Sequence, residues 1–145
     1  MPAALLLFVL LVASPDSGLV LHGARDSGRV ALTFDACPAR TYSAGVAETL
    51  TDSGVPATFF LSGRWIARFD SEALALAANP LFEFGNHSWN HPHCRNLGLA
   101  QFDAEILRTD SALRRLTSRV RPWFRFPYGE SDRRTRQEAT RLGFI

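Results

Sequence analysis

The residue types that could do chemistry in this sequence gather in three short motifs. Three of the four histidines fall within residues 86–94, which read NHSWNHPHC. His87 and His91 are spaced four residues apart, which on a helical turn puts both imidazoles on one face, able to share one metal ion. Imidazole is a good ligand for zinc and similar transition metals. We therefore predict a metal-binding pair at His87 and His91, with His93 at its rim.

A carboxylate and a guanidinium stand in comparable places elsewhere in the chain. Asp35 follows directly after the short apolar run of residues 30–34, and Arg125 lies near the end of another, just before Pro127 and Tyr128. The histidine pair follows a third such run. Polar residues are common where loops begin, so any one of these would mean little alone. Three strand ends that deliver a carboxylate, two imidazoles and a guanidinium together favour a shared site.

The elements that must position these residues alternate between strand and helix. Short β-branched and aromatic runs predict strands, and apolar residues at helical spacing between caps predict helices. The predicted strands are residues 30–34, 57–61, 81–84 and 123–126; the predicted helices are 43–53, ended by Gly54, 71–78, begun by Ser71, 101–117, and 132–142, ended by Gly143. This alternation is typical of a parallel sheet or (β/α) barrel, whose strand C-termini carry the chemistry.

Composition narrows the class of protein. The 145 residues are 46% hydrophobic and carry a formal net charge of +2, which indicates one domain with a real core and no nucleic-acid partner. Residues 3–13 form an apolar run that is too short to span a bilayer and is followed by small residues. We therefore expect residues 1–18 to be a signal peptide, the protein to be exported (periplasmic or secreted), and no transmembrane span to remain. A buried helix is the alternative, because no Lys or Arg precedes the run.

The three motifs together resemble those of the polysaccharide deacetylases, the NodB homology enzymes of carbohydrate esterase family 4. They are Thr33-Phe34-Asp35, His87-Ser88-Trp89-Asn90-His91 and Arg125-Phe126-Pro127-Tyr128-Gly129, in the family's order. The resemblance covers about residues 29–145, and residues 54–63 look like the family's second strand. It implies that residues 28–145 are a partial domain of this family. The implied fold is α/β, an incomplete (β/α) barrel of the NodB type, truncated before its last strands.

The resemblance implies a metal-dependent hydrolase that removes N-acetyl groups from N-acetylglucosamine-containing polysaccharide such as chitin or peptidoglycan. His87 and His91 would bind a divalent metal, expected to be zinc, and Asp35 would be the general base. By the family's pattern, Arg125 would pair with Asp35 and orient it. The backbone N–H of Tyr128 would donate to the oxyanion.

The resemblance also concerns the substrate and the general acid. Pro127 and Tyr128 are expected to contact the polysaccharide, and Trp89 and Trp123 are candidates for stacking on sugar rings, although core packing is the commoner fate of such residues. The family's later motifs, which supply an acetyl pocket and a histidine acid, have no counterpart before Ile145. We therefore expect an N-terminal part of a deacetylase domain that is inactive alone.

One position departs from the family's first motif, which usually has two consecutive aspartates, a base and a metal ligand. Here the second is Ala36, whose methyl group cannot bind a cation, so the metal is expected to be held more weakly. Three alternatives could replace the missing metal ligand: a water molecule, the Asp35 carboxylate or the Cys37 thiolate. Cys37 and Cys94 could instead form a disulfide or remain two unpaired thiols.

Two other functions stay open beside the deacetylase. Ala36 could have abolished metal binding, which would leave an inactive carbohydrate-binding pseudoenzyme fragment. A related amidohydrolase on a similar barrel could act on small C–N substrates instead of a glycan. Metal content separates the pseudoenzyme from the enzyme, and a comparison of glycan oligomers with small amides separates the two hydrolases.

Overall fold

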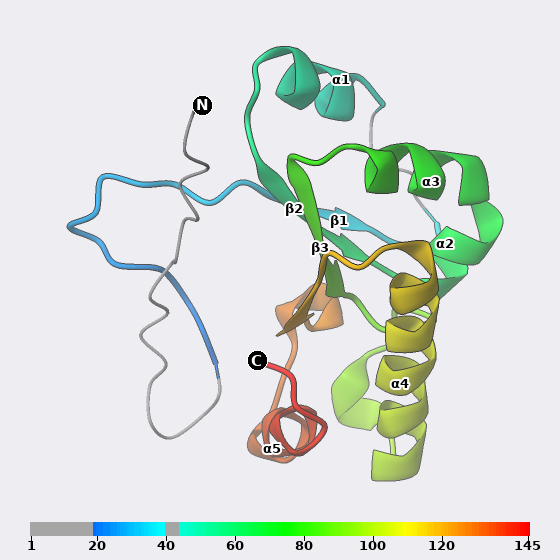
Figure 1. Cartoon of the computed structure of the whole chain (residues 1–145). Helices are drawn as coiled ribbons and strands as arrows, with labels where there is room; N and C mark the ends of the chain where they lie inside the picture. The colour runs from blue at the N-terminus through cyan, green and yellow to red at the C-terminus, as the bar shows by residue number, and fades with distance from the viewer. Residues whose placement is uncertain (1–18, 40–43) are drawn as a thin grey trace.

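Four parallel strands form the sheet around which the chain is organised, in a computed structural model that describes residues 19–39 and 44–145. The strands are β1 (Thr33–Ala36), β2 (Ala57–Leu61), β3 (Phe82–Asn86) and β4 (Val120–Phe124), side by side in chain order (Figure 1). The parallel register sets Asp35 beside Phe60 and Phe60 beside Gly85. The predicted α/β class is therefore confirmed, and four parallel strands in chain order are consistent with the predicted partial barrel.

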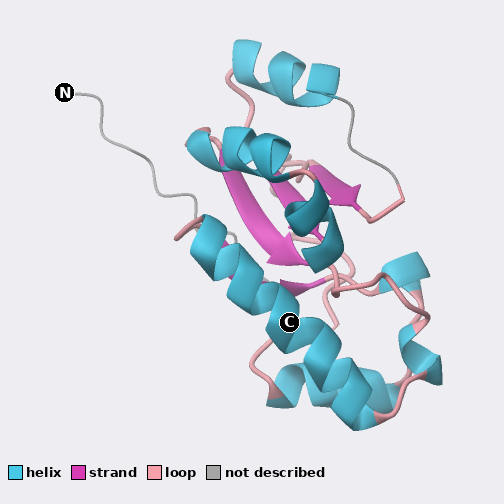
Figure 2. Cartoon of the chain, turned by 90° about the vertical axis from the view of Figure 1, so that its right-hand side faces the viewer, coloured by secondary structure: helices cyan, strands magenta, loops and turns pink. Residues whose placement is uncertain are grey.

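Helices connect consecutive strands. They are α1 (Ala44–Asp52) between β1 and β2; α2 (Gly63–Arg68) and α3 (Asp70–Ala78) between β2 and β3; the 3-10 turn η1 (Cys94–Asn96) and α4 (Leu99–Leu116) between β3 and β4; and the 3-10 turn η2 (Pro127–Gly129) and α5 (Arg133–Arg141) after β4. Helices lie over one face of the strands (Figure 2). Parallel strands require such crossovers, and helices are their usual form.

The face of the sheet that the helices cover encloses the main hydrophobic core. The segment β2 reads ATFFL and is buried along its whole length, which explains its continuous apolar character. The Phe59 ring packs edge-on against Phe82, with centroids 4.9 Å apart. The buried cluster contains Ala36, Leu50, Ala57, Phe59, Leu61, Trp65, Ala73, Leu76, Phe82, Phe84 and Leu113. A second cluster contains Cys94, Phe102, Ile106, Phe124, Ala139 and Phe144.

Several helix boundaries follow the predicted caps. Gly54 and Gly143 both have positive φ, 65° and 87°, where the absence of a Cβ lets the chain leave the helix. At the start of α5, Asp132 accepts from the Thr135 N–H at 2.7 Å, and the Thr135 hydroxyl accepts from the Asp132 N–H at 3.0 Å. This reciprocal pair satisfies two backbone donors that the helix itself leaves free.

The predicted strand at residues 30–34 begins too early. The observed β1 starts at Thr33, so Asp35 lies inside the strand, and Val30 is 85% exposed. The reason lies in the neighbouring strand, because Pro56 precedes β2 and has no N–H to donate to an earlier residue of β1. The first bond is from the Thr58 N–H to the Leu32 carbonyl, at 3.0 Å.

Other boundaries also differ from the prediction. The helix α2 was not predicted, because six residues are too few to show helical periodicity. Ser71 lies within α3, whose N-cap position is held by Phe69. The strand β3 extends to Asn86, and β4 begins at Val120 and ends at Phe124, so Arg125 lies directly after β4 and not inside it as predicted. The predicted signal peptide at residues 1–18 and the first residue of the helix predicted at 43–53 lie outside the described residues.

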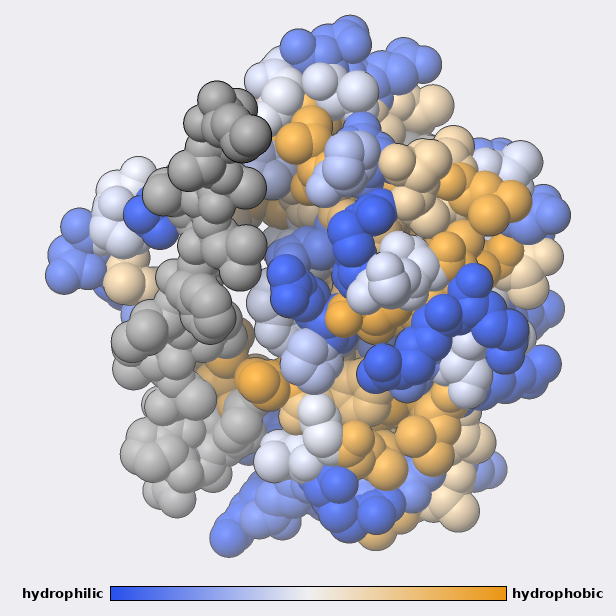
Figure 3. All heavy atoms as spheres, in the orientation of Figure 1, coloured by the Kyte–Doolittle hydropathy of each residue, from blue (hydrophilic) through white to orange (hydrophobic). Residues whose placement is uncertain are grey.

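The face of the sheet opposite the helices opens on a cavity of about 1960 Å³, with Asp35, Phe60 and Trp123 in its lining. Ile145 exchanges backbone hydrogen bonds of 2.8 Å with Pro122 and Phe124, the pattern of a parallel strand that begins beside β4. The surface seen in Figure 3 mixes hydrophilic residues with hydrophobic ones. Within the described ranges, no helix combines the length and apolar character needed to cross a membrane.

The close packing at the start of α2 gives a first testable prediction. A Cβ at Gly63 would lie 1.9 Å from the Trp89 ring, so Gly63→Ala must displace this indole. We expect the substitution to lower the free energy of unfolding by about 1–3 kcal/mol, as overpacking does. Chemical denaturation measures it. Gly23→Ala is the control, because nothing lies within 4 Å of that Cβ. Equal stability of both variants would contradict the packing.

Candidate active site

Arg125 joins the residues of the first motif to those of the last. Its Nη1 donates to Asp35 Oδ1 at 2.8 Å, and its Nη2 donates to the Thr33 hydroxyl at 3.0 Å. The guanidinium also lies over the Phe60 ring, 4.0 Å from its centroid, in a cation–π contact. These contacts from β1 and β2 orient the guanidinium and, with it, the Asp35 carboxylate. The structure therefore brings Asp35 and Arg125 together in the predicted pair.

His87 is oriented by the backbone of the same arginine. Its Nδ1 lies 2.9 Å from the Arg125 carbonyl oxygen. Because a carbonyl only accepts, Nδ1 donates, and the lone pair on Nε2 is left to face Asp35 Oδ2 at 3.8 Å. The His87 side chain is buried, and this burial lowers its pKa from the usual 6.5. The imidazole is thus held neutral, the form that binds a metal.

His91 reaches the same place through a bent loop, and the predicted helical turn is wrong. Ser88 and His91 have positive φ, 62° and 61°, in the left-handed region that an α-helix does not contain. The Ser88 hydroxyl accepts from the His91 N–H at 3.1 Å, which closes the loop. The His87 and His91 ring centroids are nonetheless 4.8 Å apart. Burial also lowers the pKa of His91.

Tyr128 connects the histidine loop to the turn after β4. Its ring packs edge-on against His91, with centroids 4.6 Å apart, and stacks on His93 at 4.2 Å. His93 is exposed, as predicted for a rim position, and its Nδ1 hydrogen-bonds Glu130 at 3.0 Å. Tyr128 has φ 59° and is 58% exposed, and Pro127 beside it is buried. The turn η2 therefore lies against the metal-ligand candidates.

The two imidazoles lie side by side and are of a type that binds zinc-like ions, but the described residues do not assemble a complete ligand set. Among the residues that the structure describes, no hydrogen-bond donor contacts His87 Nε2, and burial lowers the pKa of both rings, which favours their neutral form. Among the described residues, no group of three or more His, Cys, Asp or Glu side chains is arranged to hold a metal ion. The pair would therefore bind a metal more weakly than a three-ligand site.

The residues around the missing aspartate face different ways. Ala36 is fully buried within the apolar core cluster, whereas Asp35 and Cys37 line the open cavity. Cys37 and Cys94 are both free cysteines, so the disulfide that the sequence left open is not formed. Cys94 is buried under the loop, and burial raises the pKa of its thiol to about 12. This thiol is therefore protonated at neutral pH and unreactive.

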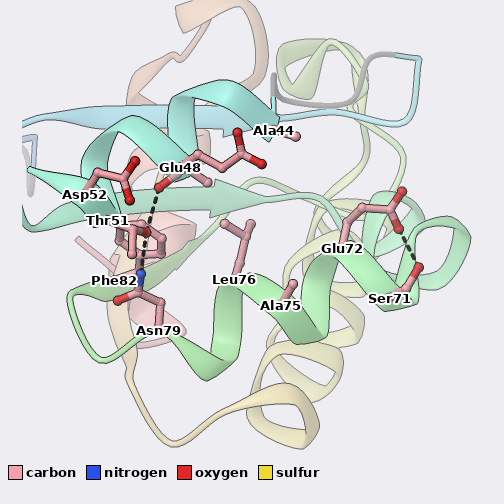
Figure 4. Close-up of a pocket in the computed structure, with 11 residues that line it drawn as sticks. Ala44, Glu48, Thr51, Asp52, Ser71, Glu72, Ala75, Leu76, Asn79 and Phe82 are labelled. Atoms are coloured by element: carbon pink, nitrogen blue, oxygen red, sulfur yellow. Dashed lines mark hydrogen bonds between the residues drawn. The ribbon is translucent and has the colours of Figure 1, made fainter.

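A second cavity, of about 440 Å³, lies between α1 and α3. Figure 4 shows Glu48 and Asp52 from α1 and Glu72 from α3 at its edge, with Asn79 donating to the Thr51 hydroxyl at 2.7 Å. The residues that line it belong to none of the three motifs. Its acidic rim and small side chains suggest no chemistry related to the histidine pair.

Three residues that the sequence did not single out hold the site together. Phe60 lies under the Arg125 guanidinium, and Asn86 accepts from the Ser88 N–H at 3.0 Å. Glu105, on α4, accepts from backbone N–H groups of the histidine loop. Asn86 gave a weak signal, because it directly precedes His87. Phe60 and Glu105 gave none, because they are ordinary residues for a strand and an amphipathic helix.

Similar proteins match most of the chain. A peptidoglycan-N-acetylglucosamine deacetylase of Bacillus cereus is 30% identical over 123 residues, which cover 85% of this chain and 44% of that protein. A family 4 carbohydrate esterase from Streptomyces lividans, solved in complex with acetate, is 32% identical with a TM-score of 0.70, over 82% of this chain and 61% of that one.

A third relative is described as a pseudoenzyme. It is a mutant of a carbohydrate esterase family 4 pseudoenzyme of Bacillus anthracis, 25% identical with a TM-score of 0.78, over 91% of this chain and 47% of that one. The chain spans less than half the length of the Bacillus cereus relative. The family model described as polysaccharide deacetylase matches residues 22–145. The chain therefore belongs to the polysaccharide deacetylase family.

Proposed function

We propose that this chain is part of a metal-dependent hydrolase that removes N-acetyl groups from N-acetylglucosamine-containing polysaccharide. The observation that carries the proposal is the position of His87, whose Nε2 faces the Asp35 carboxylate that Arg125 orients. The Bacillus cereus relative is a peptidoglycan deacetylase, which supports a peptidoglycan-like or chitin-like substrate. Because the chain spans less than half of that relative, the activity is proposed for the whole protein.

The chain's own residues would perform the base and oxyanion parts of amide hydrolysis. Asp35 is 41% exposed at its side chain, which lets it take a proton from the attacking water while Arg125 holds its other oxygen. A zinc-like ion at His87 and His91 would polarise the acetyl carbonyl. The Tyr128 backbone N–H would donate to the oxyanion as the carbonyl carbon becomes tetrahedral.

The open cavity suits a polymeric substrate better than a small amide. Its lining includes the aromatic side chains of Phe60, Trp123 and Tyr128, and the last of these is well exposed for stacking on a sugar ring. Trp89 takes a packing role instead, because Gly63 lies against its ring and the Arg108 guanidinium lies 3.8 Å from its centroid. Glycan oligomers should therefore be better substrates than small amides.

A carbohydrate-binding pseudoenzyme is the second candidate, and one observation favours it. Position 36 supplies a methyl group buried among apolar side chains where the family usually has a metal-binding aspartate. The candidate is supported by the likeness to a mutant of a Bacillus anthracis protein that is described as a pseudoenzyme of the same family. In this case the cavity would bind a glycan without hydrolysing it, and zinc would not bind at His87 and His91.

Export of the protein is part of the proposal. Peptidoglycan-like and chitin-like polymers lie outside the cytoplasm, and the apolar run of residues 3–13 has the length of a signal-peptide h-region. Residues 1–18 lie outside the described structure, so this step rests on their sequence. Cleavage after the leader would be detected as a shortened N-terminus of the secreted protein.

The metal role of the histidines can be measured on the chain itself. His87→Ala removes one of two ligand candidates, so zinc affinity should fall by about a hundredfold or more, and activity of the whole protein on chitin or peptidoglycan oligomers should be lost with it. Calorimetric zinc titration gives the affinity. Glu48→Ala is the control, because that side chain is exposed on α1 and lines the other cavity, away from the histidine pair. Unchanged zinc binding in His87→Ala would refute the assignment.

Substitution of Ala36 by aspartate distinguishes the metal-dependent deacetylase from the pseudoenzyme. Ala36→Asp should raise zinc affinity about tenfold, because a third, anionic ligand offsets the charge of the ion. The same zinc titration, with denaturation in parallel, checks it. A destabilised chain with no gain in zinc affinity would show that the methyl belongs only to the core, and would favour the pseudoenzyme.

The lowered pKa values of His87 and His91 predict the pH dependence of zinc binding. With both pKa values at the usual 6.5, the fraction of doubly neutral pairs would fall about threefold between pH 7.5 and 6.5. Because burial lowers both pKa values, protons compete only at lower pH, so zinc affinity should change by less than this over that interval and decline below it. A threefold or larger loss by pH 6.5 would contradict the burial of the pair.

A further inference from the structure

The loop that carries His87 and His91 is held from outside by a carboxylate on α4. Glu105 Oε2 accepts from the backbone N–H of Trp89 at 2.9 Å and from that of Asn90 at 2.6 Å. Glu105 Oε1 accepts from the Asn90 side-chain amide at 2.5 Å. All three donors come from the residues that separate the two imidazoles.

The Glu105 carboxylate is balanced by these dipoles rather than by a cation. Within the described parts of the chain, the ion pairs involve other acidic residues and not Glu105. Two successive N–H groups that converge on one anion form a nest, which binds negative charge well. Hydrogen bonds to a charged acceptor are roughly twice as strong as neutral ones. The contact is therefore a strong restraint on this part of the loop.

The opposite side of the loop is held by the start of α2. The N–H groups of Gly63 and Arg64 donate to the carbonyl oxygens of Ser88 and Trp89, both at 3.1 Å. The peptide groups between the two histidines are thus bound through their carbonyls by α2 and through their N–H groups by Glu105. Neither restraint can replace the other, because they act on opposite polar groups.

The loop needs this support because its backbone is strained. Ser88 and His91 both have positive φ, which for residues with a Cβ costs on the order of 1 kcal/mol each and persists only when the surroundings impose it. His91 directly follows Asn90, the residue that makes two of the three contacts with Glu105. Release of Asn90 would let His91 relax away from His87.

We propose that Glu105 is a positioning residue that sets the separation of the His87 and His91 imidazoles before any metal binds. Its effect on metal binding rests on the function proposed above, whereas its effect on the loop does not. Glu105 touches neither imidazole and acts through the backbone of Trp89 and Asn90. A loop arranged in advance gives tighter binding, because ordering is not left to the binding step.

Two variants and one control test this role. Glu105→Ala removes all three acceptors, and Glu105→Gln keeps one oxygen for the backbone N–H groups but turns an amide toward Asn90. Asp110→Asn is the control, because it removes the same charge from α4 at a surface pair with Arg114. Hydrogen exchange of the Trp89 and Asn90 amides is measured by NMR in the metal-free chain, and zinc affinity is measured by titration.

We expect both amides to exchange slowly in the wild type and Asp110→Asn, and at least about tenfold faster in Glu105→Ala, with Glu105→Gln between them. Zinc affinity should fall about tenfold in Glu105→Ala under conditions where circular dichroism shows a folded chain. If Glu105→Ala does not fold, faster exchange and weaker zinc binding in Glu105→Gln carry the same result.

Two outcomes would overturn the proposal. One is equal exchange of the Trp89 and Asn90 amides in the wild type and in the folded Glu105 variants. The other is faster exchange with zinc affinity unchanged, which would leave Glu105 a structural residue only. If the wild type binds no zinc, the proposed function fails instead, and the exchange rates alone decide whether Glu105 orders the loop.

Discussion

The site depends on one residue, Arg125, which uses its side chain and its backbone on different partners. Its guanidinium holds the Asp35 carboxylate, and its carbonyl accepts from His87 Nδ1, so the base candidate and the first metal-ligand candidate are oriented by a single residue. Its N–H in turn donates to the Asn86 carbonyl at the end of β3. Through these contacts, the relative positions of β1, β3 and β4 determine the geometry of the site. Hydrogen bonds to a charged group resist rearrangement more than neutral ones, which suits a residue in this place.

The two faces of the sheet around this residue have different roles. One face packs the hydrophobic core, and the other carries the candidate catalytic residues. The helix-covered face carries the aromatic core of β2 and β3, including Phe59 and Phe82. The other face is open and presents Asp35, Phe60 and Arg125. Burial at the edge between the faces keeps His87 neutral, since an imidazolium would lose its hydration there. The same division places Ala36 in the core, one residue from a carboxylate that faces the cavity.

Strain is concentrated where the motifs meet. Three residues with side chains have positive φ in the described structure, Ser88, His91 and Tyr128, and all three belong to the motif loops. Such conformations persist when neighbours impose them, and here the neighbours are α2, Glu105 and the ring stack of His91, Tyr128 and His93. The hydrogen bonds that hold this strained loop are a reason to expect a function there, since an unstrained loop would serve to connect β3 with α4.

The sequence alone determined the strand–helix alternation, the central strand at residues 57–61, and the placing of Asp35, His87 and Arg125 near strand ends, because periodicity and local caps are properties of short segments. It missed α2, which is too short to show a period, and it placed β1 too early, because pairing depends on where β2 begins. Only the tertiary structure decided that His87 and His91 meet through a strained loop and not a helical turn. It alone brought Glu105 and Phe60 to the site and left both cysteines free, because those contacts join residues far apart in the chain.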